Sequence, residues 1–473
     1  MTQAYVLGLG QSGIAAAKLL HRLGWDVVIS DGKDTPSLRE RSQALVADGI
    51  NLALGGFPDW QSLVDGGTSV NLIVVSPGIP WDHPSLQAAR ALGIETIGEM
   101  ELAWRQMRHI PWVAITGTNG KTTTTSLTAA IFQGAGLRAV ACGNIGLAAC
   151  EVALQALTDP PDWIIAELSS FQIEAASTIQ PEVGIWTTFT PDHLNRHYTV
   201  DNYRQIKASL IHQAKHIVLN GDDPQIAHTG PALWPKAIWT ATTPTFTEAL
   251  DTGATVVDGW VTFAGEKLFP LSRWSLLGDH NVQNLLVSVA AARLARIKPA
   301  AIETAIAAFT GVAHRLEPVR SLTHADGKIT FINDSKATNY DAAEVGLKSV
   351  NEPVILIAGG QPKQGDATGW LREIHQRACR VLLIGEAREL FAQMLQDAHY
   401  HNYELMEALD QAVPRALALA TELITKTPSS SESHTENAVT VLFSPACASF
   451  DQFANFEQRG DYFRKLCQDL ESD

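Results

Sequence analysis

The sequence predicts an α/β protein of three domains, and two observations support this. The chain has 473 residues, whereas a single hydrophobic core stops growing at about 250–300 residues, and domains of about 150 residues are common. Three segments also run from a short, β-branched strand through a Gly- or Ser-rich turn into a helical pattern, as in parallel α/β sheets. The strands that open these segments are expected at residues 5–9, 112–116 and 329–332.

Breaks in the helical patterns predict where the domains meet. Pro111 ends one helical pattern and places the first boundary near residue 108. A later helical pattern stops before Gly311, so the last domain is expected to begin near residue 312. We therefore expect domains at residues 1–108, 109–311 and 312–473.

The last domain contains three further apolar strands, each followed by a turn, which predicts a Rossmann-like parallel sheet. We expect these strands at residues 354–358, 381–385 and 439–444. The polar segment 425–437, with its run of three serines, is expected to form a surface loop.

Composition and charge exclude several classes of protein. A chain with 45% hydrophobic and 18% charged residues is globular rather than disordered. The net charge of -15 disfavours nucleic acid and anionic membranes as partners. Five cysteines without CxxC spacing indicate neither a disulfide framework nor a zinc cluster. With no leader-like start and no run of about 18 apolar residues, we expect a cytoplasmic protein.

The central domain opens on a glycine-rich turn that carries a lysine. Glycines let backbone N–H groups approach phosphate oxygens, and the following helix N-terminus adds positive potential. Lys121 can reach the β- and γ-phosphates, and Thr122 can place its hydroxyl on Mg²⁺. Ile115 holds the position of the first glycine in GxxxxGK[ST], so an ordinary helix start is the alternative. The candidates for this P-loop ATPase-like site are Gly117, Thr118, Asn119, Gly120, Lys121, Thr122 and Thr123.

A second glycine-rich turn follows the first strand of the chain. Gly8, Gly10 and Gly13 form a GxGxxG pattern, and Asp31 ends the next strand at the distance of a ribose-binding acid. The pattern predicts a Rossmann-like domain that binds a nucleotide or nucleotide sugar. NAD binding and a tight turn that only packs helix on strand are the alternatives.

Four polar residues of the central domain are further candidates. Glu167 ends an apolar strand beside the P-loop, where a Mg²⁺ ligand is expected. His193 lies in a dense polar run and can be a second ligand, hold substrate or lie on the surface. Lys207 occurs in a helical pattern, where its residue type alone indicates a solvated lysine. Asn284 follows a helix start and reaches a nucleotide only if folding brings it near Lys121.

The last domain places cations at strand ends. Arg315, Lys336 and Lys363 can meet phosphate or carboxylate through charge-assisted hydrogen bonds. The run that contains Ser449 follows a strand and opens a helix, so its N–H groups and hydroxyl suit a carboxylate ligand. A packed turn with a buried Cys447 is the alternative.

Taken together, these segments resemble the Mur ligase family of ATP-dependent amino-acid ligases, over all three domains. The resemblance rests on an ordered set of motifs. They are GTNGKT at 117–122, GNIG at 143–146, ELSSFQ at 167–172, DHLNRH at 192–197, HN at 280–281, HR at 314–315, DSKATN at 334–339 and SPACASFDQF at 444–453.

The resemblance implies roles for particular residues. The N-terminal domain would bind UDP through Gln11, Ser12 and Asp31, and Asn144 would face the nucleotide sugar. Lys121 and Thr122 would hold ATP phosphates and Mg²⁺, with Glu167 and His193 serving metal ions. Lys207 would be carbamoylated and bind a second Mg²⁺. The remaining ATP ligands would be Asn284, Arg315 and Asp334, and the amino-acid pocket would comprise Lys336, Thr338, Lys363, Ser449 and Phe456.

The sequence departs from the family pattern at two places. The loop around Lys363 reads GGQPKQGD rather than GGDGKG, and Asn195 replaces the acid of DHLDRH.

Within the family, GLGQSG, ELSSFQ and SPACASFDQF most resemble members that add D-glutamate to UDP-N-acetylmuramoyl-L-alanine through an acyl phosphate, in peptidoglycan precursor synthesis. We expect a monomer with these small-molecule substrates. Three alternatives are the L-alanine-adding members that act on UDP-N-acetylmuramate, an NAD-dependent dehydrogenase, and a non-catalytic nucleotide switch.

Overall fold

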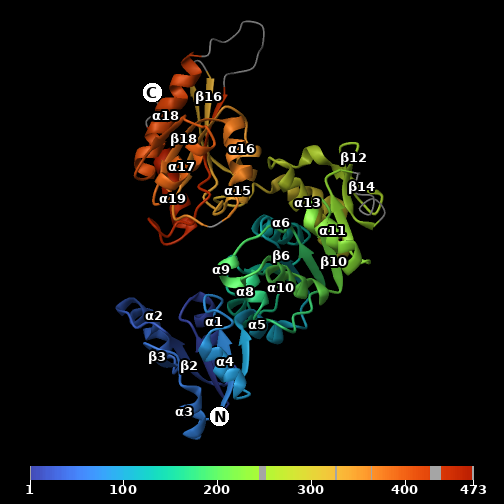
Figure 1. Ribbon diagram of the computed structural model, residues 1–473. Helices are drawn as coiled ribbons and strands as arrows, with labels where there is room; N and C mark the ends of the chain where they lie inside the picture. Colours follow the sequence, from blue (N-terminus) through green and yellow to red (C-terminus); the bar gives the residue numbers. More distant parts are fainter. Residues whose placement is uncertain (1, 244–251, 325–326, 364, 427–437, 471–473) are drawn as a thin grey trace. The chain divides into compact units, whose positions relative to one another are not determined.

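The computed structural model describes residues 2–243, 252–324, 327–363, 365–426 and 438–470 (Figure 1). It confirms the α/β fold, with three sheets built mainly from parallel strands. Contacts divide the chain into two compact units. The first comprises Met1–Ser275 and Gln283–Phe309, and the second comprises Leu276–Val282 and Thr310–Asp473.

The first sheet is parallel throughout, in the order β3-β2-β1-β4-β5. Alternate residues of its strands enter two separate cores, so helices cover both faces. On β1, Val6 packs with α1 and Leu7 packs with α3 and α4. The elements are β1 Gln3–Leu7, α1 Gln11–Arg22, β2 Asp26–Asp31, α2 Pro36–Ala47, β3 Asn51–Leu54, α3 Trp60–Asp65, β4 Val70–Val75, α4 Pro84–Ala91, β5 Glu95–Gly98 and α5 Glu99–Met107.

The second sheet has the order β14-β13-β12-β11-β10-β9-β6-β8-β7. Its strand β6, fully buried between β9 and β8, is Trp112–Thr116, as predicted. The helices and strands that follow β6 are α6 Lys121–Gly134, β7 Ala139–Gly143, α7 Ala149–Ala156, β8 Trp163–Glu167, α8 Ser170–Ile173, β9 Val183–Trp186, α9 Leu194–His197, α10 Val200–His212, β10 His216–Asn220, α11 Pro224–Leu233, β11 Ile238–Ala241, β12 Ala254–Val257, β13 Trp260–Phe263, β14 Glu266–Pro270, the 3-10 helix η1 Leu271–Arg273, α13 Asp279–Leu294 and α14 Pro299–Ala308.

The third sheet has the order β15-β16-β20-β17-β18-β19. Its strands also alternate between two cores: Leu356 of β17 packs with α15 and α16, and Ile357 packs with α18 and α19. The elements are β15 Glu317–His324, β16 Gly327–Asn333, α15 Tyr340–Lys348, β17 Val354–Gly359, α16 Thr368–Arg377, β18 Ala378–Ile384, α17 Arg388–Asp397, β19 Tyr403–Leu405, α18 Leu409–Lys426, β20 Ala438–Phe443 and α19 Phe456–Asp469.

Two features differ from the expectations. The first strand lies two residues earlier than predicted, because Gly8 has a φ of +96° and turns the chain although Leu9 is apolar and buried. Antiparallel strands also extend two of the sheets. In the second sheet β13 pairs antiparallel with β12 and β14, and in the third sheet β15 pairs antiparallel with β16. Of the expected loop at 425–437, residues 427–437 lie outside the described residues and the first two end α18.

None of the helices in the described ranges combines the length and apolarity that crossing a bilayer requires.

A buried carboxyl group at the start of α5 is expected to make stability depend on pH. Glu99 Oε1 accepts the Cys150 N–H at 2.6 Å, and Oε2 has no hydrogen-bond partner among the described residues. Burial raises the pKa of Glu99 to about 7. Because the folded state favours the protonated form, this contribution to stability is full below the ordinary glutamate pKa and is lost as pH rises through about 7.

In the wild type, Glu99 is expected to lower the free energy of unfolding by roughly 3 kcal/mol between pH 5 and pH 8. The Glu99→Gln variant is expected to lack this decrease. Urea unfolding at both pH values measures this difference. The exposed Glu40→Gln change on α2 serves as the control and leaves the slope as it is in the wild type. An equal pH dependence in the wild type and Glu99→Gln contradicts the expectation.

Candidate active site

The P-loop follows β6, which lies between β9 and β8. The carboxyl ends of these three neighbouring strands therefore meet at the loop. Gly117 has a φ of +150°, and a Cβ at this position would lie 2.0 Å from Thr187 Oγ1. Gly120 precedes α6 in the left-handed conformation, with a φ of +82°, and gives the helix no side-chain cap. The turn thus requires glycine and leaves the first N–H groups of α6 for an anion.

Two lysine side chains converge on the same carbonyl oxygen of this loop. Lys121 Nζ donates to the carbonyl oxygens of Gly117 and Thr118, both at 2.8 Å. Lys207 Nζ, on α10, donates to the Gly117 oxygen at 2.9 Å. Lys207 is 1% exposed, so the interpretation as a solvated helix lysine is wrong.

Burial and, secondly, the positive charge of Lys121 hold the pKa of Lys207 well below its ordinary value. Two ammonium groups this close repel each other unless an anion lies between them or one is neutral. The site can therefore relieve this repulsion in two ways, by binding an anion between the two lysines or by keeping the Lys207 amine unprotonated.

Glu167 ends β8 beside this loop, as predicted. Its Oε1 accepts a hydrogen bond from Asn144 Nδ2 at 2.8 Å, whereas its buried Oε2 has no hydrogen-bond partner among the described residues. A buried carboxylate oxygen left without a donor fits a cation ligand. The described chain holds no group of three His, Cys, Asp or Glu side chains that forms a metal site. Glu167 and, in the first turn of α6, Thr122 carry the oxygen ligands that Mg²⁺ takes, and Mg²⁺ often has few protein ligands and shares substrate phosphates.

His193 precedes α9 with a φ of +56°. Its backbone N–H donates to Asp192 Oδ1 at 2.8 Å, and its ring centroid lies 4.9 Å from that of Phe171. Phe171 follows Glu167 by four residues, so the two predicted metal ligands lie on segments that contact each other.

Folding also brings Asn284 to the P-loop. Its Oδ1 accepts a hydrogen bond from Thr124 Oγ1 at 3.2 Å, and a Cβ on Gly120 would lie 2.6 Å from the same atom. The side chain is buried where α13 packs on α6. Asn284 was expected to reach a nucleotide only if folding brings it near the loop that carries Lys121, and the structure places it there.

The glycine-rich turn after β1 lies where the strand order of the first sheet reverses. Asp31 Oδ2 accepts the Leu9 N–H at 2.9 Å, so the acid shapes the turn from the end of β2. A Cβ on Gly13 would lie 1.8 Å from the Gly8 oxygen, which excludes any other residue there. Gln11 and Ser12 begin α1 at this edge, Gln11 exposed and Ser12 half-buried.

The second unit holds the remaining candidates. Asp334, buried after β16, accepts hydrogen bonds from the Leu316 N–H at 3.2 Å and Ser444 Oγ at 2.9 Å. Arg315 Nη1 lies 3.4 Å from Asp334 Oδ1. Burial raises the pKa of Asp334, with Arg315 acting in the opposite direction. The two predicted ATP ligands of this unit therefore form an ion pair.

The candidates for the amino-acid pocket lie on loops after β16, β17 and β20 and at the start of α19. Lys336 Nζ lies 4.5 Å from the centre of the Phe456 ring. Burial raises the pKa of the Cys447 thiol to about 12, and the nearby Lys363 acts in the opposite direction. Cys447 lies two residues before Ser449 in the sequence. Thr338 is half-buried and follows Lys336, to whose carbonyl its N–H donates at 2.9 Å.

Arg459 joins the loops that carry these candidates and was missed by the sequence analysis. The guanidinium donates to Ser335 Oγ at 3.0 Å, to the Ser335 oxygen at 2.8 Å, and to the oxygens of Cys447 and Ala448. It thereby connects the loops after β16 and β20. Burial lowers its pKa to about 10. No recognisable motif surrounds this arginine, so a single sequence gives no reason to select it.

The sequence analysis also missed two threonines after β9. Thr187 Oγ1 donates to the Asn119 oxygen at 2.6 Å, and Thr188 Oγ1 accepts the Asn119 N–H at 2.9 Å. They hold the P-loop in place from 68 or more residues away in sequence. The Thr-Thr pair itself carries no distinctive pattern.

Three stretches of the chain match known family descriptions. They are the MurD-like N-terminal domain of Mur ligases at residues 2–98, the Mur ligase middle domain at 115–292 and the Mur ligase glutamate ligase domain at 314–425. A UDP-N-acetylmuramoylalanine--D-glutamate ligase of Crocosphaera subtropica is 52% identical over 99% of this chain and 100% of its own length. The chain belongs to the Mur ligase family. The similarly named protein of Synechocystis sp. is 51% identical, with the same coverage of both chains.

Solved Mur ligase structures share the fold of this Mur ligase. The UDP-N-acetylmuramate-alanine ligase MurC of Thermotoga maritima matches with a TM-score of 0.57 and 19% identity over 99% of both chains. A pseudomurein peptide ligase type C of Methanothermus fervidus matches with a TM-score of 0.56 and 18% identity over the full length of both. This Mur ligase is accordingly an ATP-dependent ligase with three Mur ligase domains.

Proposed function

We propose that the chain joins D-glutamate to UDP-N-acetylmuramoyl-L-alanine, with cleavage of ATP to ADP and phosphate, in peptidoglycan precursor synthesis. Relatives about half identical over the whole chain carry the name of this reaction. The observation that carries the chemistry is the pair of lysines on one P-loop carbonyl, next to a buried carboxylate. This arrangement supports a triphosphate with its cation.

The reaction has two steps. A carboxylate oxygen of the nucleotide sugar attacks the γ-phosphorus and ADP leaves, which gives an acyl phosphate. The neutral amine of D-glutamate then attacks the acyl carbon, phosphate leaves, and the nitrogen loses one proton and keeps the other as the amide N–H. Lys121 and the N–H groups of α6 stabilise the charge on the transferred phosphoryl group.

Magnesium ions would neutralise phosphate charge in both steps. Thr122, Glu167 and His193 are the residues proposed to hold them. A carbamate on Lys207 would supply a second anionic ligand, and the buried, unprotonated amine described above supports that modification. We propose two ions, with the carbamate serving one of them.

The roles proposed for the other site residues follow from the resemblance of their motifs to those of the family. Gln11, Ser12 and Asp31 would bind the UDP part, and Asn144 would face the nucleotide sugar. Asn284, Arg315 and Asp334 would contact ATP, whereas Lys336, Thr338, Lys363, Ser449 and Phe456 would surround D-glutamate. We further propose domain limits at 108 and 311, and a monomer that acts in the cytoplasm.

Phosphate release across a panel of L- and D-amino acids tests the function. We expect release with UDP-N-acetylmuramoyl-L-alanine only when D-glutamate is added. Release with UDP-N-acetylmuramate and L-alanine instead would assign the L-alanine-adding reaction. Titration with NADH is expected to show no binding, and ATP binding without amino-acid-dependent turnover would leave only a nucleotide switch.

A further inference from the structure

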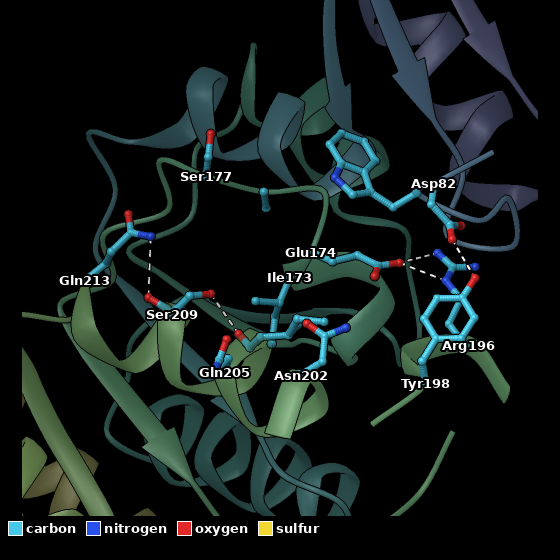
Figure 2. A pocket seen from close by; sticks show the side chains of 13 residues that line it. Asp82, Ile173, Glu174, Ser177, Arg196, Tyr198, Asn202, Gln205, Ser209 and Gln213 are labelled. Atoms are coloured by element: carbon cyan, nitrogen blue, oxygen red, sulfur yellow. Dashed lines mark hydrogen bonds and ion pairs between the residues drawn. The ribbon is translucent and has the colours of Figure 1, made fainter. Parts of the chain in front are cut away.

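A cavity of about 550 Å³ in the first unit is bounded by Trp81 and Asp82 of the N-terminal domain and by α8 and α10 of the central one. Figure 2 shows a pair of contacts on its wall: Arg196 with Glu174, and Tyr198 with Asp82. None of these four residues entered the mechanism above.

Arg196 lies in α9, three residues after His193, and contacts both domains. Its Nε donates to Glu174 Oε1 at 2.9 Å, and its Nη2 donates to that oxygen and, at 3.1 Å, to the Ile79 carbonyl oxygen. The side chains of Arg196 and Glu174 are only 12% and 11% exposed. A guanidinium with three contacts in a mostly buried place fixes geometry closely.

The same guanidinium contacts the His193 segment through an aromatic ring. It lies 4.7 Å from the centre of the Phe171 ring, which in turn lies 4.9 Å from the His193 ring. On the other side of the pair, His197 Nδ1 lies 3.6 Å from Glu174 Oε2. Burial lowers the pKa of His197 to about 4, so this ring is neutral near pH 7 and Arg196 is the cation beside Glu174.

The N-terminal end of this connection lies in the segment after β4, which contacts the turn expected to bind the nucleotide sugar. Ile79 follows Ser76, whose Oγ donates to the Gly8 carbonyl oxygen at 3.2 Å. Tyr198 OH adds a second contact to this domain, donating to Asp82 Oδ2 at 2.6 Å. A continuous path of contacts thus joins the Gly8 turn to His193 through Arg196.

We propose that Arg196, held by Glu174, is a positioning residue that aligns the nucleotide-sugar turn of the N-terminal domain with His193. The inference rests on the proposed function. Removing the pair shifts the bound sugar relative to the γ-phosphate, whereas the P-loop, Lys121 and Asn284 keep their contacts. The effect is therefore expected on the nucleotide sugar and on turnover, and not on ATP.

The test uses the double variant Arg196→Met/Glu174→Gln in the full chain. Removing both charges avoids an unpaired buried charge, so the fold is expected to remain. The KM for UDP-N-acetylmuramoyl-L-alanine should rise about tenfold and kcat should fall about tenfold, whereas the KM for ATP should stay within about twofold. The matched control is Arg204→Met/Asp201→Asn, which removes an arginine–aspartate pair on α10 whose carboxylate is 80% exposed.

Equal changes in both KM values, or kinetics within about twofold of the control, overturn the proposal. If the double variant shows no cooperative thermal unfolding, Arg196→Lys replaces it, with a smaller selective rise in the same KM expected and its absence counting against the proposal. A wild-type chain that fails to release phosphate with D-glutamate contradicts the proposed function instead, independently of these variants.

Discussion

Replacing Lys121→Ala is expected to lower the rate of ADP release by about 10³-fold. The ammonium group hydrogen-bonds the P-loop carbonyls of Gly117 and Thr118 at 2.8 Å, beside the uncapped start of α6. A transferred phosphoryl group would exchange these contacts for its own, and Lys207, whose amine is unprotonated, would not replace the lost positive charge in the variant. Initial rates with saturating substrates measure the loss.

The Lys121→Ala fold should survive, because the lost hydrogen bonds contribute about 1 kcal/mol each. Thermal unfolding of the variant checks this. Lys215→Ala removes an exposed lysine paired with Glu182 and is expected to keep the wild-type rate. Near-normal ADP release from a folded Lys121→Ala protein would refute the phosphate role.

Replacing Lys207→Met is expected to have a comparable effect, about 10³-fold on kcat, if the lysine carries a carbamate. The unprotonated Nζ attacks CO₂, an N–C bond forms and a proton leaves, which turns a buried neutral amine into an anion. The depressed pKa of Lys207 favours the reactive amine near neutral pH. Methionine has a similar length and no amine, so it removes the modification with little change in packing.

Carbon-13 NMR in labelled bicarbonate detects the modification directly. We expect a carbamate signal from the wild type and none from Lys207→Met. The Lys121→Ala variant should keep the signal, because burial, the larger cause of the low pKa, is unchanged. A carbamate signal that persists in Lys207→Met, or wild-type turnover by that variant, contradicts the assignment.

Local features were predictable from the sequence because they depend on neighbouring residues. Glu167 ends β8 and Asp31 ends β2 as expected, since the apolar runs and the turns that follow them are adjacent in the chain. The glycine-rich turns were likewise found, and the close approaches at Gly13 and Gly117 explain why glycine is needed there.

Other features depend on contacts between distant segments and left no pattern. The burial of Lys207 arises from packing against Gly117, 90 residues away, so its residue type alone indicated solvent exposure. Arg196 reaches Ile79 across 117 residues. The antiparallel strands β13 and β14 are short, and nothing in their composition separates them from parallel ones.

The four hydrogen bonds of Arg459 carry a consequence for synthesis of the chain. This arginine lies on α19, the last helix among the described residues, yet it joins segments around Ser335 and Cys447. During synthesis the P-loop leaves the ribosome long before Arg459, so these four hydrogen bonds form late. The proposed amino-acid capture therefore requires that synthesis has passed Arg459, so shorter chains are not expected to couple a wrong amine.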